Sequence, residues 1–185
     1  MKIRTYISLS LDGFMASSDG APAMDVMPSF EPGVSHGIQD FLADCSAVIV
    51  GRTVFDFGYN YWRESGMWAW QDKRVYVLTS QPLPDSLPPD TIASRGGPVA
   101  LRAQIEADNL PGDVHLVGGL SSIRAFFEIG AIDEFGVLIL PVLLHEGTPL
   151  FPLGAQRQWL KLESSQTFPD GSCHLVYKLV NSLAS

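Results

Sequence analysis

Three short segments each join the end of an apolar run to glycine, hydroxyl or cationic residues. They are Gly51-Arg52-Thr53, Thr79-Ser80-Gln81 and Gly118-Gly119-Leu120. Glycine allows backbone conformations that other residues rarely adopt, and free N–H groups at a helix start attract anions, most often phosphate. The segments therefore predict a pocket for a phosphorylated ligand. The alternative is that they are ordinary strand-to-helix connections, because such short motifs are weak evidence.

Two further segments carry candidate proton donors. Asp12-Gly13 follows a predicted strand and is a strong turn signal. Asp12 is either a catalytic acid or a residue that only braces the turn through its side chain. His36, at a predicted helix start, is either a proton donor, because imidazole titrates near neutral pH, or a partly exposed structural residue. Between them, the irregular residues 16–33 predict either a mobile loop over a site or a surface loop.

Aromatic residues are concentrated in residues 59–70. They are Tyr59, Tyr61, Trp62, Trp68 and Trp70. Such side chains either form a lid that stacks on a flat ring, or cover a core or a subunit contact. Together with an exposed edge strand, this stretch predicts a homodimer.

The elements that must position these residues alternate along the chain. Apolar runs predict strands at residues 2–11, 47–50, 74–78, 91–94, 114–117 and 135–140. Helical spacing predicts helices at residues 34–45, 54–57, 98–108 and 122–129, the last capped by Ser121 or Ser122. Residues 159–167 and 172–180 alternate around a Pro-Asp-Gly turn and predict an antiparallel hairpin.

This order predicts an α/β fold with a mostly parallel central sheet, helices on both faces and a C-terminal antiparallel hairpin. In such a sheet the segments that follow the strands lie along one edge, where ligands bind. The 185 residues suit a single domain over residues 1–185, and 46% hydrophobic residues predict a packed core.

Charge and cysteine content narrow the function further. The net charge of −8 argues against nucleic acid and anionic membranes as partners. The two cysteines form no metal-binding spacing, so no metal is expected, and they fit a reducing compartment. Without a signal-peptide pattern or a membrane-length apolar run, the expected location is the cytoplasm.

Seven segments together resemble the dihydrofolate reductase superfamily, and most closely the reductase domain of the bifunctional deaminase-reductases of riboflavin biosynthesis and its stand-alone relatives. The segments are Ser10-Leu11-Asp12-Gly13, Val48-Ile49-Val50-Gly51-Arg52-Thr53, Val75-Tyr76-Val77-Leu78-Thr79-Ser80, Leu116-Val117-Gly118-Gly119, Ile132-Asp133-Glu134-Phe135, Pro141-Val142-Leu143-Leu144 and Gly147-Thr148-Pro149-Leu150-Phe151. The resemblance covers nearly the whole chain. It implies a dihydrofolate-reductase-like fold and NADPH as the hydride donor.

The resemblance also implies roles for individual residues. Arg52 would face the 2′-phosphate of NADPH, because a guanidinium suits phosphate by forked hydrogen bonding. Arg95 would add a second cation, and a cis peptide would join Gly118 to Gly119. The remaining residues expected at the cofactor are Gly13, Gly51, Thr53, Thr79, Ser80, Leu120, Ser121 and Ser122. Asp12 would lie beside the nicotinamide as the catalytic residue. Residues expected at the substrate are His36, Phe57 and Trp62.

The substrate half departs from the family pattern. Phe14 stands where the riboflavin reductases usually carry lysine, and Val117 stands where they often carry an acidic residue. Neither Ser35 nor His36 is the carboxylate that dihydrofolate reductase uses to bind its pterin, and the deaminase half is absent. The expected function is an NADPH-dependent reductase of a small heterocyclic, pterin- or pyrimidine-like substrate. The alternatives are 5-amino-6-(5-phosphoribosylamino)uracil reductase, dihydrofolate reductase, or a non-catalytic nucleotide-binding module.

Overall fold

The computed structural model describes residues 1–26, 35–152, 154–155 and 157–180. Contacts divide the chain into two compact units. The first unit consists of Met1–Arg4 and Asp40–Ile132, and the second of Thr5–Gln39 and Asp133–Ser185. Within the described ranges, no helix has the length and apolarity needed to cross a bilayer.

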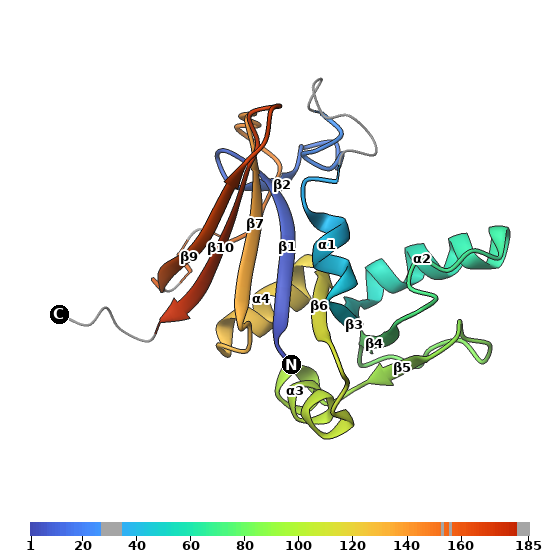
Figure 1. Cartoon of the computed structure of the whole chain (residues 1–185). Helices are drawn as coiled ribbons and strands as arrows, with labels where there is room; N and C mark the ends of the chain where they lie inside the picture. The colour runs from blue at the N-terminus through green and yellow to red at the C-terminus, as the bar shows by residue number, and fades with distance from the viewer. Residues whose placement is uncertain (27–34, 153, 156, 181–185) are drawn as a thin grey trace. The chain divides into compact units, whose positions relative to one another are not determined.

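Parallel strands form the centre of the first unit (Figure 1). β3 (Cys45–Gly51), β4 (Arg74–Leu78), β5 (Thr91–Ser94) and β6 (Asp113–Gly118) lie in the order β5-β4-β3-β6. The first residues of β1 (Ile3–Ser10) pair with β6, with Ile3 opposite Val114. Ile49 of β3 lies opposite Tyr76 on one side and Leu116 on the other, and all three are fully buried. Apolar residues fill these strands because a parallel sheet is covered on both faces.

Three helices belong wholly to this unit: α2 (Arg52–Ser65), α3 (Gly97–Asp108) and α4 (Leu120–Glu128). α2 is much longer than the predicted helix over residues 54–57. It ends at Gly66, whose φ of 76° lies in the left-handed region and whose N–H bonds the carbonyl of Trp62. α4 begins at Leu120 with Gly119 as its N-cap and no side-chain cap, so the predicted capping by Ser121 or Ser122 is wrong. Glycine is itself an acceptable N-cap, and the helix therefore starts before the serines.

The aromatic stretch mainly covers a core. Tyr59, Trp62 and Trp70 pack against a cluster that contains the buried Phe55 and Trp68. Phe55 of α2 packs with valines of β3 and β4 in this cluster, and Tyr59 and Trp62 extend the packed side of α2 past residue 57. The core-covering alternative is confirmed for these residues, whereas Tyr61 is half exposed.

Antiparallel strands dominate the second unit. The rest of β1 is followed by β7 (Glu134–Leu140), β10 (Cys173–Val180) and β9 (Trp159–Thr167) in that order. β10 pairs antiparallel with both β7 and β9, which confirms the predicted hairpin. A two-stranded sheet that was not predicted joins β2 (Phe14–Ala16) to β8 (Thr148–Pro149).

Two predictions fall partly on residues 27–34, which lie outside the described residues: the irregular stretch 16–33 and the helix 34–45. In the described part of the first, Ala23 is buried against Leu138 and Leu140. The helix is shorter than predicted, since α1 spans Ile38–Ala43. Ser35 Oγ accepts a hydrogen bond from the N–H of Gln39 at 3.3 Å, next to its start.

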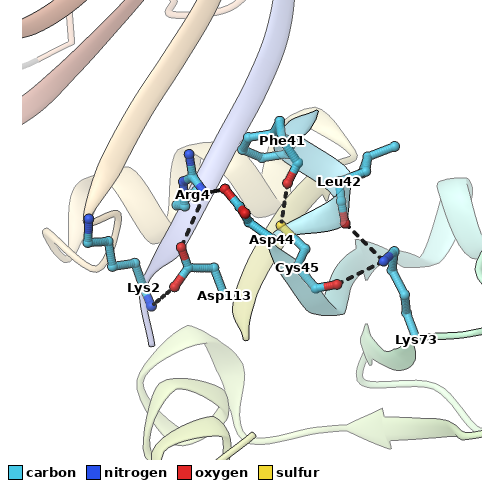
Figure 2. Close-up of polar contacts among 8 residues, drawn as sticks. All are labelled: Lys2, Arg4, Phe41, Leu42, Asp44, Cys45, Lys73 and Asp113. Carbon is cyan, nitrogen blue, oxygen red and sulfur yellow. Dashed lines mark hydrogen bonds and ion pairs between the residues drawn. The ribbon is translucent and has the colours of Figure 1, made fainter. Parts of the chain in front are cut away.

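A polar network ties together the amino ends of strands in the first unit (Figure 2). Asp113 accepts the Lys2 N–H at 2.8 Å and Arg4 Nη1 at 3.2 Å, and Arg4 Nη1 also reaches Asp44 at 3.3 Å. Lys73 Nζ donates to the carbonyls of Leu42 at 3.0 Å and of Cys45 at 2.8 Å, at the end of α1. The strand starts are thus held by charge-assisted bonds between segments far apart in sequence.

His115 is buried beside this network. Its ring packs edge-on against Phe41 at 4.8 Å, yet neither ring nitrogen has a hydrogen-bond partner among the residues that the structure describes. Burial, with the nearby charges of Arg4 and Lys73, lowers the pKa of His115 from 6.5 to about 4.

We expect His115 to make the first unit acid-sensitive. Because its folded-state pKa lies below the unfolded value, the unfolded chain binds the extra proton, and stability is lost as the pH falls from 6.5 toward about 4. The loss is roughly 3 kcal/mol over that window. In His115→Leu this acid-induced loss should disappear. The free energy of unfolding near pH 7 should be unchanged or higher, because the substitution removes a buried polar ring that lacks a hydrogen-bond partner in the described part of the chain.

Urea unfolding at neutral pH and near pH 4.5 checks this prediction. Val114→Ala is the matched control, since it removes neighbouring apolar contacts without removing a titratable group. It should lower the free energy of unfolding by the same amount at both pH values. An equal pH dependence in native chain and His115→Leu would contradict the prediction.

Candidate active site

The carboxyl ends of β4 and β5 and the start of α4 enclose a pocket in the first unit. Its volume is about 290 Å³, close to the small end of ligand pockets. Most of its lining residues carry hydroxyl groups and lie at the ends of segments: Thr79, Ser80, Ser94, Ser121 and Ser122. The others are Leu78, Arg95 and Gly97. Five predicted cofactor residues are therefore brought together here: Thr79, Ser80, Arg95, Ser121 and Ser122. The structure adds Ser94 and Gly97, which the sequence reasoning missed.

A close approach joins two of the predicted glycine turns. A Cβ placed on Gly51 would lie 2.6 Å from Ser122 Oγ and 3.0 Å from the Gly119 nitrogen. Only a residue without a side chain lets the end of β3 come this near the start of α4. The Gly118–Gly119 peptide bond is cis, as the resemblance implied. The N–H groups of Ser122 and Ile123 donate to the carbonyl of the N-cap Gly119 at 2.9 and 3.1 Å. Those of Leu120 and Ser121 precede them and have no carbonyl partner within the helix, which suits them to bind an anion.

Arg52 and Arg95 differ in what holds them. Arg52 Nε donates to both carboxylate oxygens of Asp56, at 2.7 and 2.9 Å, and its Nη1 donates to the carbonyl of Pro82 at 3.1 Å. Arg52 does not line the pocket. Arg95 does, it is exposed, and its guanidinium pairs with none of the residues that the structure describes. The cation that is available at the pocket is therefore Arg95.

Hydrogen bonds fix the polar edge of the pocket. The Thr79 N–H donates to the carbonyl of Ser94 at 3.1 Å, and Thr79 Oγ1 accepts the N–H of Gln81 at 3.1 Å. Thr79 is buried, whereas Ser80 and Thr53 are exposed. These contacts hold the ends of β4 and β5 beside one another, with the Ser80 hydroxyl accessible.

Asp12 lies in the second unit, in the turn after β1. Its carboxylate accepts Ser10 Oγ at 2.6 Å, the Leu144 N–H at 3.2 Å and the His145 N–H at 2.8 Å. The Ser10 hydrogen bond, followed by those from His145 and Leu144, lowers the pKa of Asp12 to about 2. Asp12 is thus a carboxylate at neutral pH, and it braces its own turn against residues 144–145. Gly13, with φ of 87°, completes the turn.

His36 is held in the second unit by contacts on several sides. Its Nε2 lies 2.7 Å from Asp170 Oδ2, its carbonyl accepts the Tyr6 hydroxyl, and its ring meets Phe168 edge-on at 5.0 Å. Although burial opposes it, hydrogen bonds from Ser172 and His36 lower the pKa of Asp170 to about 2. His36 is buried, so the expectation of a partly exposed helix-start residue is wrong.

The other two predicted substrate residues lie on α2 and do not line the pocket. Phe57 is 81% exposed, and Trp62 packs against the aromatic core cluster. Among the residues that sequence reasoning missed, Ser94 could have been found. It is a hydroxyl residue at the end of a predicted strand, as Thr79 is. The ion pair between Arg52 and Asp56 could also have been predicted, because Asp56 stands four residues after Arg52 on a helix.

Two proteins of Bacillus subtilis (strain 168) are similar to this chain along most of their length. YwjB is 30% identical over 164 residues, which is 88% of this chain and 90% of YwjB. YyaP is 30% identical over an alignment of 197 residues, which is 92% of this chain and 91% of YyaP. Both relatives are uncharacterized proteins. No family model matches the chain.

Solved structures share the architecture. A protein of Shewanella sp. PV-4 that is named for riboflavin biosynthesis has a TM-score of 0.81 at 21% identity, covering 98% of this chain and 100% of its own. Dihydrofolate reductase from Enterococcus faecalis, in complex with NADP(H), has a TM-score of 0.61 at 12% identity, covering 98% and 97%. The chain belongs to the family of YwjB and YyaP and has the fold of the dihydrofolate-reductase-like superfamily.

Proposed function

We propose that this protein is an NADPH-dependent reductase that transfers hydride to a small heterocyclic, pterin- or pyrimidine-like ring that carries no phosphate. The observation that carries the proposal is the pocket at the ends of β4 and β5, which the exposed Arg95 lines together with hydroxyl groups and a helix start. The fold of the family supports a reductase, and one solved relative in fold binds NADP(H).

The residues present fit the phosphate-bearing half of NADPH. Arg95 would take the 2′-phosphate, and Thr79 and Ser80 would contact the adenosine side. The N–H groups of Leu120 and Ser121 would bind the pyrophosphate. Gly51 and Gly119 have no side chains, so the backbone beside these N–H groups stays accessible. We assign Arg52, with Thr53, a supporting place beside the turn, because Asp56 already neutralises its guanidinium. A bound NADPH would supply the hydride.

On the substrate side, Asp12 and Gly13 would lie beside the nicotinamide. An aspartate with a pKa of about 2 holds no proton to donate at neutral pH, so water supplies the proton. Asp12 then acts as a positioning residue that holds residues 144–145 against the turn. The pair of the buried His36 with the partly exposed Asp170 holds the segment before α1 in the same way.

The charged residues of the second unit favour a ring without phosphate over the phosphoribosyl substrate of the alternative. Residues 5–39 contain no Lys or Arg, and residues 133–185 contain only Arg157, Lys161 and Lys178. These three lie before or near the start of β9 and the end of β10, away from the hairpin turn. The end of the second unit that holds the β1 turn and the hairpin turn instead carries four acidic residues: Asp12, Asp19, Glu146 and Asp170. Such a surface repels a phosphate.

A substrate panel tests the proposed activity. NADPH oxidation is followed with dihydropterins, pyrimidines and other reducible rings, beside calorimetric titration of NADPH alone. Turnover of a ring without phosphate supports the reductase. Tight NADPH binding without turnover of any ring favours the nucleotide-binding module, and no affinity for either pyridine nucleotide excludes both.

We expect Arg95→Gln to remove discrimination between NADPH and NADH. Loss of a charge-assisted bond to phosphate costs about 1.5–3 kcal/mol, which is roughly a 10- to 100-fold weaker NADPH Kd, with the NADH Kd little changed. Arg52→Gln is the matched control and should have the smaller effect, because Asp56 engages that side chain. Titration of both nucleotides decides this. A larger effect at Arg52, or an equal loss of NADPH and NADH at Arg95, would contradict the assignment.

A matched pair of substrates, one ring with and without a phosphate, tests the substrate class. The phosphorylated member should show a KM higher by about tenfold or more, and the gap should narrow as salt screens the repulsion. Glu146→Lys should narrow the KM difference at low salt, because Glu146 is one of the exposed acidic residues at the end of the second unit that holds the β1 turn. Preference for the phosphorylated ring would instead favour the ribosylaminouracil reductase.

A further inference from the structure

Asp56 controls the direction of the Arg52 guanidinium. Both residues lie on α2, four positions apart, so their side chains meet on one side of the helix. Arg52 Nε donates to the two carboxylate oxygens of Asp56 at 2.7 and 2.9 Å, and Arg52 Nη1 donates to the carbonyl of Pro82 at 3.1 Å. The guanidinium is thus held from two sides, and it cannot turn elsewhere without breaking these bonds.

The backbone of Arg52 stands beside the pocket, although its side chain does not line it. β3 and β4 end together, since Gly51 pairs with Leu78, and Leu78 lines the pocket. Gly51 also approaches Ser122, another lining residue, so closely that a Cβ on Gly51 would lie 2.6 Å from Ser122 Oγ. Arg52 is the next residue along the chain. The direction of its side chain therefore keeps Arg52 out of the pocket.

Asp56 acts against a bound phosphate in two ways. Its carboxylate neutralises the Arg52 guanidinium, and its own negative charge repels an anion that approaches the turn after β3. Both side chains also remain in contact with solvent, with 34% of Arg52 and 43% of Asp56 exposed. An ion pair with this exposure contributes little to stability, because water and salt screen it. Asp56 can therefore be replaced in a folded chain, and the effect on a ligand can be measured by itself.

We propose that Asp56 is a specificity-determining residue that keeps Arg52 away from the 2′-phosphate of NADPH, so that Arg95 alone distinguishes NADPH from NADH. This inference rests on the proposed function, in which Arg95 takes the 2′-phosphate, and it names the residue that sets the strength of the preference. Because one of two arginines is withheld, the native chain prefers NADPH only moderately. Release of Arg52 increases that preference.

Calorimetric titration of NADPH and NADH into the native chain and Asp56→Asn tests this inference. In Asp56→Asn the NADPH Kd should fall about five- to tenfold, because a second guanidinium becomes available for a charge-assisted bond and a repelling charge is lost. The NADH Kd should change little, because NADH lacks the 2′-phosphate. Asp56→Glu keeps an acid four residues after Arg52 and should therefore keep the native ratio of the two constants.

Three further variants separate the release of Arg52 from the loss of a charge. Glu64→Gln is the matched control, because it removes one negative charge from an exposed position on the same helix, and it should leave the preference for NADPH unchanged. Asp56→Asn combined with Arg52→Gln should lose the gain in NADPH affinity. In the Asp56→Asn background, Arg95→Gln should weaken NADPH binding less than it does in the native chain, because Arg52 can replace Arg95.

Chemical modification of arginine reports on the ion pair without any nucleotide. Phenylglyoxal reacts with accessible guanidinium groups, and mass spectrometry of the peptides locates the modified residue. In the native chain Arg95, which is exposed, should react faster than Arg52. In Asp56→Asn, Arg52 should react severalfold faster than it does in the native chain, whereas the rate at Arg95 should stay the same.

Two results would overturn the inference and leave the proposed function standing. One is a ratio of the NADPH and NADH constants that Asp56→Asn leaves unchanged. The other is a native Arg52 that reacts with phenylglyoxal as fast as Arg95. If the native chain binds neither nucleotide, the inference fails together with the proposed function. Circular dichroism checks that each variant folds, and Asp56→Ala takes the place of Asp56→Asn if the latter does not.

Discussion

The absence of a side chain at residue 51 is the constraint on which the candidate site depends. A Cβ at Gly51 would lie 2.6 Å from Ser122 Oγ and 3.0 Å from the Gly119 nitrogen, so any other residue would push the end of β3 away from α4. With glycine there, the turn after β3 and the start of α4 pack backbone against backbone. Backbone N–H groups then face outward next to a pocket that hydroxyl residues line. The site is therefore built from main-chain geometry first and from side chains second.

Charge is distributed unevenly between the two units, and this bears on the chemistry proposed for each. Nine of the twelve Lys and Arg residues lie in the first unit, and Arg95 leaves a cation at its pocket. In the second unit, Asp12 and Asp170 are both held as carboxylates by donated hydrogen bonds. Those bonds lock loops in place rather than leave an acid ready to give up a proton. In the proposed function, the first unit binds the phosphates of the cofactor and the second unit orients an uncharged ring.

Sequence patterns predicted the elements whose signal is local. β4 and β5 have the predicted bounds because each is an apolar run between turn residues. α2 was predicted too short because Tyr59 and Trp62, which continue the helical spacing of Phe55, were assigned to an aromatic stretch interpreted as a lid or as a cover for a core or a subunit contact. Within the site, the hydroxyls that end strands were predictable. The pairing of His36 with Asp170, 134 residues apart, was not, since no local pattern encodes it.

The ion pair between Arg52 and Asp56 has a consequence for how a polyanion would approach. A guanidinium that forks onto a neighbouring carboxylate has no net charge at long range, so Arg95 is left to attract ligands at the pocket. A chain with net charge −8 meets an incoming dinucleotide with overall repulsion. Encounter would then accelerate as ionic strength rises and screens that repulsion, which is the reverse of electrostatic steering.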